Sequence, residues 1–599
     1  MALVVQKYGG TSVGTVERIQ AVAQRVYQTV QRGNSLVVVV SAMGKSTDTL
    51  VNLARQITAN PSDREMDMLL STGEQVSIAL LSMALQELGQ PAVSLTGAQV
   101  GIVTEAAYSR ARILQIRTNR IQKHLDKGEV VVVAGFQGMS DREDLEITTL
   151  GRGGSDTSAV ALAASLKANR CEIYTDVPGI LTTDPRLVPQ AQLISEITAD
   201  EMLELASLGA SVLHPRAVEI ARNFGILLVV LSSWSDAPGT RVTSPLPKPR
   251  SLEALELAKA VDGVQLDTNQ SKVALLRVPD CPGVAAKLFG ETASVGVDVD
   301  LIIQSIHELA TNDIAFTVEQ KMLPQAEAVA HAMAAHLGDP TIANTEVIVD
   351  NNIAKIAISG AGIIGRPGIA AKMFQSLSDA GINIKMISTS EVKVSCVIDR
   401  QECDRAARIL CQVFEIASSS LPASTVDNTV KPAVTSVALD RYKARVAIIH
   451  VPDRPGKAAQ IFSILARHHI TVDTIIQSQR CRVIDDVPTR DIAFTVARED
   501  AEMARDAISK FASLIGFQEI IVDKAVAKVS VVGSGMLGQP GVAAKLFTAL
   551  ANENINIQMI ATSEIKISCV VAQSDGVKAL QVVHDAFNLA GDKTIKVGS

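Results

Sequence analysis

The sequence predicts an α/β protein in which a three-layer αβα domain with a mainly parallel sheet precedes a set of α+β modules. Three observations lead to this prediction. Short β-branched runs alternate with longer segments of helical period over residues 1–233, a cluster of prolines follows, and the remainder repeats itself at a constant spacing. Alternating strands and helices are typical of a parallel sheet covered by helices, and a constant spacing indicates duplicated units.

The elements of the first part follow from its hydrophobic periodicity. Strands are predicted at 3–6, 36–40, 130–134, 172–175 and 227–231, and helices at 16–29, 47–57 and 157–168. Ligands of such folds bind at the carboxyl ends of the strands. Pro238, Pro245, Pro247 and Pro249 cannot continue a helix or an inner strand. We therefore place the first domain at 1–240 and a linker at 241–260.

The second part of the chain is duplicated. The segment 280–283, Asp-Cys-Pro-Gly, recurs as Asp-Arg-Pro-Gly at 453–456, and the segment 362–374 recurs at 535–547, both 173 residues later. Within each copy, a shorter motif also recurs 85 residues later. The two repeats together divide this part of the chain into four modules, which we expect at 261–350, 351–420, 435–523 and 524–599. A linker rich in Ser, Thr and Pro is expected at 421–434.

Each module has the element order of a ferredoxin-like fold (βαββαβ). The first is expected to contain strands at 272–278, 297–305 and 313–319 and helices at 284–294 and 324–336. A unit of roughly 70–80 residues has only a marginal core, so modules should pair through sheets or helices. We expect two tandem pairs.

Composition excludes several classes of protein. The 56 basic and 63 acidic side chains leave a net charge of −7, and 47% of the 599 residues are hydrophobic. Disorder and general nucleic-acid binding are therefore not expected. Residues 1–7 lack the features of a secretory signal, and the longest apolar runs, such as 226–231, are too short to cross a bilayer. Seven scattered cysteines without a Cys-x-x-Cys pair, and nine histidines without ligand spacing, favour a cytoplasmic protein without a structural metal.

Two glycine motifs suggest nucleotide binding but fit it poorly. Residues 360–365 and 533–538 spell G-x-G-x-x-G, yet a hairpin follows where a nicotinamide-binding fold needs parallel crossovers. Tight turns that start a helix explain these glycines better. Gly44-Lys45-Ser46 resembles the end of a P-loop, but Val39 stands where that motif needs glycine.

Three other segments predict a phosphate site at the strand ends. Lys7 and two glycines lie between the first strand and the first helix; alone, an ordinary tight turn would explain those glycines. The segment 149–158 carries Arg152 in a glycine-rich turn and Ser155 and Asp156 at a helix start, where a simple N-cap is the alternative. The segment 174–186 places polar residues directly after a strand. Backbone donors, a lysine and an arginine suit a transferring phosphoryl group.

These three segments resemble the signatures of the aspartate kinase family, which belongs to the amino-acid kinases, and the modules resemble its ACT regulatory domains. Four modules instead of two resemble the cyanobacterial type. The resemblance covers essentially the whole chain and implies phosphorylation of L-aspartate to 4-phospho-L-aspartate with ATP and Mg²⁺, the first step towards lysine, threonine, methionine and isoleucine.

The resemblance also implies roles for individual residues. Lys7, Arg152 and Asp156 would be catalytic: Lys7 would neutralise charge on the transferred phosphate, and Asp156 would orient Lys7 or the N–H groups of the glycine loop. The aspartate substrate would be bound by Thr47, Glu74, Arg152 and Ser155. ATP would be bound by Lys7, Tyr8, Gly9, Gly10, Ser41, Thr175, Asp176, Asp184 and Arg186. Many relatives have lysine where this chain has Ser211. For Glu74, a carboxylate that complements the helix dipole is the structural alternative.

For regulation, the resemblance implies feedback inhibition by lysine and threonine, bound where modules meet, and a homodimer or larger homo-oligomer formed through the modules. The matching positions are Asp280, Gly283, Val284, Ala285, Asp298, Asp300, Gln304 and Ser305, and in the second copy Asp453, Gly456, Asp473, Gln477 and Ser478. Turn chemistry alone would explain Asp280 and Asp453. Two other functions remain open: an amino-acid sensor without catalysis, and a kinase for glutamate, N-acetylglutamate or a nucleotide monophosphate.

Overall fold

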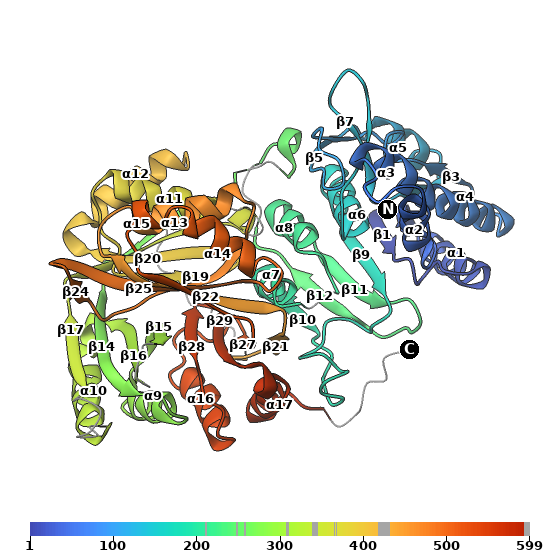
Figure 1. Ribbon diagram of the computed structural model, residues 1–599. Helices are drawn as coiled ribbons and strands as arrows, with labels where there is room; N and C mark the ends of the chain where they lie inside the picture. Colours follow the sequence, from blue (N-terminus) through green and yellow to red (C-terminus); the bar gives the residue numbers. More distant parts are fainter. Residues whose placement is uncertain are drawn as a thin grey trace.

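The computed structural model describes residues 1–209, 212–246, 250–256, 259–306, 311–337, 345–363, 366, 368–416 and 432–591, without the side chains of 305 and 306. The N-terminal domain lies beside the repeated modules (Figure 1). Ser211, most of the expected linker 421–434 and the end of the expected fourth module lie outside the described residues.

An eight-stranded sheet forms the centre of the N-terminal domain. Its order is β10-β12-β11-β9-β1-β2-β6-β3, and all neighbours are parallel except β11 and β12. The strands are β1 (Ala2–Tyr8), β2 (Asn34–Val40), β3 (Ala92–Leu95), β6 (Val130–Ala134), β9 (Arg170–Thr175), β10 (Glu196–Thr198), β11 (Leu228–Ser232) and β12 (Thr240–Thr243). Buried valine runs in β2 and β6 are typical of a parallel sheet that is covered on both faces.

Helices cover both faces of this sheet, because successive side chains of a strand point to opposite sides. Val38 and Val40 of β2 belong to the core beneath α1 (Val16–Gln31) and α4 (Thr72–Glu87). Val37 and Val39 belong to the opposite core, beneath α6 (Gly154–Ser165) and α8 (Pro215–Phe224). The predicted αβα fold class is confirmed.

The helices α3 (Asp63–Leu70) and α4 form a stretch that is long and apolar enough to cross a membrane by length and composition. In the structure they are two helices, and the N-cap of the second is Ser71. Ile78, Leu81 and Leu85 of α4 are buried in the core beneath the sheet. The apolar face of α4 is therefore explained by the packing of the domain.

A second sheet, which the sequence analysis did not predict, packs against α6. Its order is β5-β4-β7-β8. The strands are β4 (Ile102–Thr104), β5 (Ile113–Ile116), β7 (Gln137–Ser140) and β8 (Ile147–Thr149). Strands this short show too little alternation to be recognised in a sequence. The last of them, β8, leads directly into the glycine-rich segment that carries Arg152.

The boundary predicted at residue 240 needs correction. Strand β12 pairs with β11 and β10, so the first sheet continues into the segment expected to be a linker. Further along, the buried Glu256 accepts a hydrogen bond from the Ile113 backbone and forms an ion pair with Arg216. The first domain therefore extends at least to Glu256.

The modules have the predicted ferredoxin-like pattern, which confirms that part of the fold class. Module 1 contains β14 (Gln270–Pro279), α9 (Val284–Ser294), β15 (Val299–Ile306), β16 (Thr311–Glu319), α10 (Leu323–Leu337) and β17 (Glu346–Asp350). Module 3 repeats it with β22 (Lys443–Pro452), α13 (Lys457–Arg467), β23 (Val472–Gln477), β25 (Val487–Ala497), α14 (Ala501–Ser509) and β26 (Glu519–Asp523). Helices α9 and α13 begin after Gly283 and Gly456, whose φ values of 98° and 97° favour glycine.

Modules 2 and 4 each take a strand that precedes the module before them. Strand β13 (Gly263–Asp267) pairs with β18 (Ile353–Ser359) of module 2, and β21 (Ser436–Asp440) pairs with β27 (Val526–Val532) of module 4. The expected ranges 261–350 and 435–523 therefore each include one strand of another module. Module 1 therefore lies, in the sequence, between the first strand of module 2 and the rest of that module. Module 3 is inserted into module 4 in the same way.

The remaining elements complete these two modules. Module 2 continues with α11 (Ile369–Asp379), β19 (Met386–Thr389), β20 (Lys393–Asp399) and α12 (Cys403–Val413). Module 4 continues with α16 (Val542–Asn552), β28 (Met559–Ser563), β29 (Lys566–Ala572) and α17 (Gly576–Ala586). Their sheets have the orders β13-β18-β20-β19 and β28-β29-β27-β21.

The expected tandem pairing is also corrected: module 1 pairs with module 4, and module 2 with module 3. Strands β15 and β28 pair edge to edge, which joins modules 1 and 4 into one eight-stranded sheet. Phe289 of α9 and Phe547 of α16 pack with ring centroids 5.4 Å apart, and Phe374 of α11 and Phe462 of α13 at 5.5 Å. The two paired sheets then face each other across a shared core, with helices on the outside (Figure 1).

Candidate functional site

The first glycine loop lies at the carboxyl end of β1. Lys7 and Tyr8 end this strand, and Gly9 and Gly10 follow. A Cβ atom at Gly10 would lie 2.8 Å from the Ala42 carbonyl oxygen, so only glycine allows this close approach to the turn after β2. The carbonyl of Gly10 accepts a hydrogen bond from the Gly44 N–H at 3.0 Å. The loops after β1 and β2 are thereby held against each other.

Helix α6 begins at the same place. Lys7 Nζ lies 2.6 Å from Asp156 Oδ1 in the first turn of α6, and both side chains are almost buried. Gly153, at φ 66°, precedes the helix. The free N–H groups of a helix N-terminus and a lysine both attract phosphate. The structure therefore brings together Lys7, the glycine loop and Asp156, as the sequence predicted.

The ring of Tyr8 lies in the core of the domain. Its side chain is fully buried and stacks on Tyr174 with ring centroids 4.6 Å apart. Only its backbone reaches the loop region, where its carbonyl accepts the Ser41 N–H at 3.1 Å. Tyr8 therefore supports the site from the core instead of contacting a nucleotide with its ring.

Glu74 lies in the first turn of α4, next to the turn after β2. Its Oε1 accepts the Ala42 N–H at 3.1 Å, while Oε2 is buried without a hydrogen-bond partner in the described part of the chain. Burial raises the pKa of this carboxyl from 4.5 to about 7. Thr47 follows the same turn after β2, at the start of α2 (Ser46–Ile57). A substrate ammonium group would supply the partner that Glu74 lacks.

Arg152 is exposed and, among the described residues, makes no ion pair. Two residues that the sequence analysis missed hold its segment in place. Asp67, fully buried on α3, accepts hydrogen bonds from Thr149 N at 2.8 Å and from Thr149 Oγ1 at 2.7 Å. A Cβ atom at Gly153 would lie 2.3 Å from the ring of His214. Neither contact has a local sequence signal, because both partners are distant in the chain.

The segment after β9 borders a cavity of about 240 Å³. Thr175, Asp176, Asp184 and Arg186, all predicted to bind ATP, line it. Arg186 Nη2 lies 2.7 Å from Asp184 Oδ2. Other walls come from α7 (Ala199–Ser207) and, unexpectedly, from module 4: β21 and α17 contribute Val437, Ala438, Leu439 and Leu580. The cavity is apolar on that side and charged at its Asp184–Arg186 end.

Comparisons with known proteins agree with this geometry. The amino acid kinase family model matches residues 2–232, and ACT domain models match 356–414, 445–516 and 529–587. An aspartokinase of Geobacillus stearothermophilus is 50% identical over 420 residues, which is 70% of this chain and 99% of that protein. The crystal structure of an aspartate kinase from Synechocystis superposes with a TM-score of 0.87 at 65% identity, covering 100% of both chains. The chain belongs to the aspartate kinase family. The predicted family and kinase activity are confirmed.

An aspartokinase of Thermus thermophilus is 48% identical over 418 residues, 69% of this chain and 99% of that protein. Both of these shorter aspartokinases thus match over nearly their full length, whereas the Synechocystis enzyme matches this chain from end to end. The four-module architecture of this aspartate kinase is therefore shared with the Synechocystis structure.

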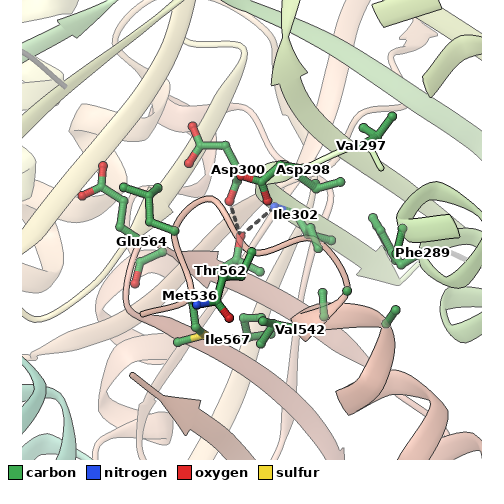
Figure 2. Close-up of a pocket in the computed structure, with 18 residues that line it drawn as sticks. Phe289, Val297, Asp298, Asp300, Ile302, Met536, Val542, Thr562, Glu564 and Ile567 are labelled. Carbon is green, nitrogen blue, oxygen red and sulfur yellow. Dashed lines mark hydrogen bonds between the residues drawn. The ribbon is translucent and has the colours of Figure 1, made fainter. Parts of the chain in front are cut away.

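Two of the predicted effector residues, Asp298 and Asp300, line a cavity of about 80 Å³ between modules 1 and 4 (Figure 2). Asp298, Asp300 and Glu564 lie on one side of it, and Phe289, Met536 and Val542 lie on the other. Thr562 joins the modules at its base, donating to Asp300 O at 3.3 Å and accepting the Ile302 N–H at 2.7 Å. Burial, and then the Asp300 charge, raise the pKa of Asp298.

Two of the aspartates predicted to bind an effector form ion pairs with lysines of other modules. Asp300 forms an ion pair with Lys355, and Asp473 forms one with Lys528. The Asp473 pair is almost fully buried, and the lysines around it hold the pKa of Asp473 well below its usual range against the effect of burial. These two carboxylates therefore link neighbouring modules through ion pairs, and an effector that took their place would first have to break a buried pair.

The other predicted positions surround the two Pro-Gly turns. Gly283, Val284, Ala285 and Gln304 line a small cavity between modules 1 and 4, and Asp453, Gly456 and Gln477 line the matching cavity between modules 2 and 3. Asp280 is hydrogen-bonded to Asn312 and Asn556, which line the first of these cavities. Ser478 is buried nearby, with its hydroxyl accepting the Asp491 N–H at 3.2 Å. The side chain of Ser305 lies outside the described part of the structure.

Proposed function

We propose that this aspartate kinase transfers the terminal phosphoryl group of ATP to the side-chain carboxylate of L-aspartate, the first step towards lysine, threonine, methionine and isoleucine. The observation that carries this proposal is the Lys7–Asp156 pair, at the point where the glycine loop meets the N-terminus of α6. An aspartate oxygen attacks the γ-phosphorus, the bond to the β–γ bridging oxygen breaks, and ADP leaves with the displaced electron pair. Such a transfer needs positioning and charge neutralisation more than covalent catalysis.

We assign binding of the phosphate and of the aspartate substrate to the pair and the residues around it. Lys7 and the glycine-loop N–H groups neutralise charge on the transferred group, and Asp156 holds Lys7 in position. Arg152 binds a substrate carboxylate, helped by Ser155 and Thr47. Glu74 binds the α-ammonium group with its unpartnered oxygen. A substrate bound in this way presents its side-chain carboxylate to the phosphate.

ATP requires a divalent cation, for which we propose Mg²⁺. Among the described residues, no group of three or more His, Cys, Asp or Glu side chains could hold a metal by itself. This fits Mg²⁺, which is usually held by substrate phosphates with only one or two carboxylates. Asp156 is the carboxylate placed to serve in this way, and the ion would neutralise charge on the phosphates.

An acceptor screen tests the substrate. Purified enzyme is incubated with ATP, Mg²⁺ and hydroxylamine, and the acyl hydroxamate is measured with aspartate, glutamate or N-acetylglutamate as acceptor; ADP release is followed with nucleotide monophosphates. We expect turnover with aspartate and at least about 100-fold lower kcat/KM with the others, since the side-chain carboxylate must reach a fixed phosphate. A preference for glutamate would contradict the substrate assignment. Absence of turnover with every acceptor would favour a sensor without catalysis.

We further propose feedback inhibition by lysine and threonine, bound between modules. The cavity in Figure 2 combines acidic side chains with an apolar wall, which suits an aliphatic amino acid. Inhibition requires that the effector binds an inactive arrangement more tightly than the active one. A homodimer or larger oligomer formed through the modules, and a cytoplasmic location in keeping with seven free cysteines, belong to the same proposal.

A further inference from the structure

The loop that follows β11 reaches the glycine loop, although 221 residues separate Ser12 from Ser233. Strands β11, β9 and β1 are consecutive and parallel in the first sheet. The loops that follow them therefore start side by side at one edge of this sheet. The loop between β11 and β12 covers residues 233–239, and none of these residues belongs to the site described so far.

Ser233 contacts both of the neighbouring loops. Its Oγ lies 2.6 Å from Oγ of Ser12, and its N–H donates to the carbonyl of Thr175 at 2.8 Å. Ser12 closes the glycine loop, with its N–H bound to the carbonyl of Gly9 at 2.9 Å. Thr175 ends β9 and begins the segment that we propose for ATP. Ser233 thus joins the phosphate side of the proposed site to its nucleotide side.

The hydroxyl of Ser12 depends on this contact. Ser12 is 0% exposed, and within the described part of the chain its Oγ has no hydrogen-bond partner other than Ser233. A buried hydroxyl that loses its partner is costly, so the pair fixes the position of Ser12. Because Ser12 is fully buried, its hydroxyl acts on the conformation of the glycine loop and does not touch a phosphate.

A second contact joins the same two loops. The guanidinium of Arg18 lies 4.7 Å from the ring centroid of Trp234, and Arg18 Nη1 donates to the carbonyl of Thr11 at 2.8 Å. Arg18 belongs to the first turn of α1, directly after the glycine loop. Further along α1, Arg25 forms an ion pair with Asp236 at 3.5 Å. Arginine stacked on tryptophan is a favourable contact. The β11 loop therefore has a support on α1 that is independent of the serine pair.

The glycine loop is consequently held from two sides. On one side, the carbonyl of Gly10 accepts the Gly44 N–H from the turn after β2. On the other side, Ser12 is bonded to Ser233. N–H groups that neutralise a transferring phosphate act best from fixed positions, because then no reorganisation is needed during the reaction.

We propose that Ser233 is a positioning residue for phosphoryl transfer. Its hydrogen bond to Ser12 holds the glycine loop in register with the segment that begins at Thr175, so that both act on the same ATP molecule. This inference rests on the proposed function and adds to it a residue that supports the reaction without touching the reacting atoms.

A double-mutant cycle tests this role. Steady-state kinetics with ATP, Mg²⁺ and aspartate compare the full-length wild type with Ser233→Ala, Ser12→Ala and the double variant. We expect each single variant to lower kcat/KM for ATP about tenfold and to leave KM for aspartate within about twofold, since each breaks one buried hydrogen bond at the glycine loop. The double variant should lose no more than either single variant, because both hydroxyls act through one bond.

Two further variants serve as controls. Ser233→Thr keeps the hydroxyl and should recover most of kcat/KM for ATP. Ser235→Ala, in the same loop and exposed, should behave as the wild type.

The proposal would be overturned by a wild-type kcat/KM for ATP in Ser233→Ala, or by losses that add up in the double variant. A parallel rise in KM for both substrates would also overturn it, since this would indicate a general disturbance of the domain. A wild type that does not phosphorylate aspartate would instead reject the proposed function, and the role of Ser233 with it.

Discussion

At the scale of single residues, the ion pair between Lys7 and Asp156 is the contact on which the proposed phosphoryl transfer depends most. Both side chains are almost buried, and their ions lie 2.6 Å apart. We expect Lys7→Ala and Asp156→Ala each to lower kcat at least about 100-fold, because each removes a preorganised charge from the transferring phosphate. Steady-state kinetics with aspartate and ATP measure this change.

The control for this prediction is Lys321→Ala. Lys321 also forms a pair, with Glu319, but both side chains are exposed on the surface of module 1. We expect a kcat close to that of the wild type. Near-normal turnover in both Lys7→Ala and Asp156→Ala would contradict the roles assigned to the pair.

Glu74 predicts a pH dependence of stability. Burial raises its pKa from 4.5 to about 7, so between these pH values the folded enzyme binds a proton that the unfolded chain has released. The contribution of Glu74 to the free energy of unfolding therefore falls as pH rises from about 4.5 to 7 and stays low above that. At about 1.4 kcal/mol per pH unit, the change amounts to about 3 kcal/mol.

Glu74→Gln removes this titration. Compared with the wild type, its free energy of unfolding should be nearly unchanged at pH 4.5 and higher at pH 8, as measured by denaturant titration at both values. The same variant should raise KM for aspartate and abolish the fall in KM that we expect as Glu74 ionises between pH 6 and 8. A constant difference in stability across this range would show that Glu74 does not titrate there.

At the scale of elements, the loop after β9 is held by α17 of module 4. Thr182 Oγ1 and His584 Nε2 lie 2.9 Å apart, and the Val437 N–H of β21 donates to Thr182 O at 2.8 Å. Leu187 and Val188 of this loop pack into the core of modules 1 and 4. Since the same loop carries Asp184 and Arg186, module 4 positions one side of the cavity that we propose for the nucleotide.

Thr182→Val tests this contact with little change in volume. We expect KM for ATP to rise about five- to tenfold, the effect of losing a hydrogen bond of about 1 kcal/mol, with kcat and KM for aspartate unchanged. Lys578→Ala, on an exposed side of the same α17, is the matched control. A parallel rise in KM for both substrates would indicate a general loss of structure instead of a specific effect on the nucleotide loop.

At the scale of the whole molecule, a buried ion pair joins the kinase domain to the modules. Glu204 of α7 and Lys566 of β29 lie 2.6 Å apart and are almost fully buried, and Glu204 also accepts the Glu391 N–H of module 2 at 3.0 Å. Leu205 on the same helix lines the cavity that we propose for the nucleotide. Helix α7 therefore connects the modules with the proposed ATP site.

Lys566→Met should lower the free energy of unfolding by about 3–5 kcal/mol, because it leaves the Glu204 charge buried without a cation to balance it. The double variant Glu204→Leu with Lys566→Met should recover most of this loss, since two apolar side chains replace the whole pair. Calorimetric melting temperatures compare the three proteins. Equal melting temperatures for the wild type and Lys566→Met would contradict the importance of the junction.

Local patterns determined a large part of this protein in advance. Valine runs predict β2 and β6, glycines at strand ends predict the loop at Lys7, and a constant spacing reveals the duplication, because each signal depends on residues close together in the chain. The relation of Lys7 to Asp156 was expected from the family resemblance, and the structure places the two side chains 2.6 Å apart.

Only the tertiary structure decided which modules pair, where β13 and β21 lie, and which side chains support the site from a distance. Asp67 and His214 reach the Arg152 segment from elsewhere in the fold. Edge strands such as β15 and β28 expose similar donors and acceptors at every position. Their partners are therefore chosen by the packing of the whole chain, which no local pattern records.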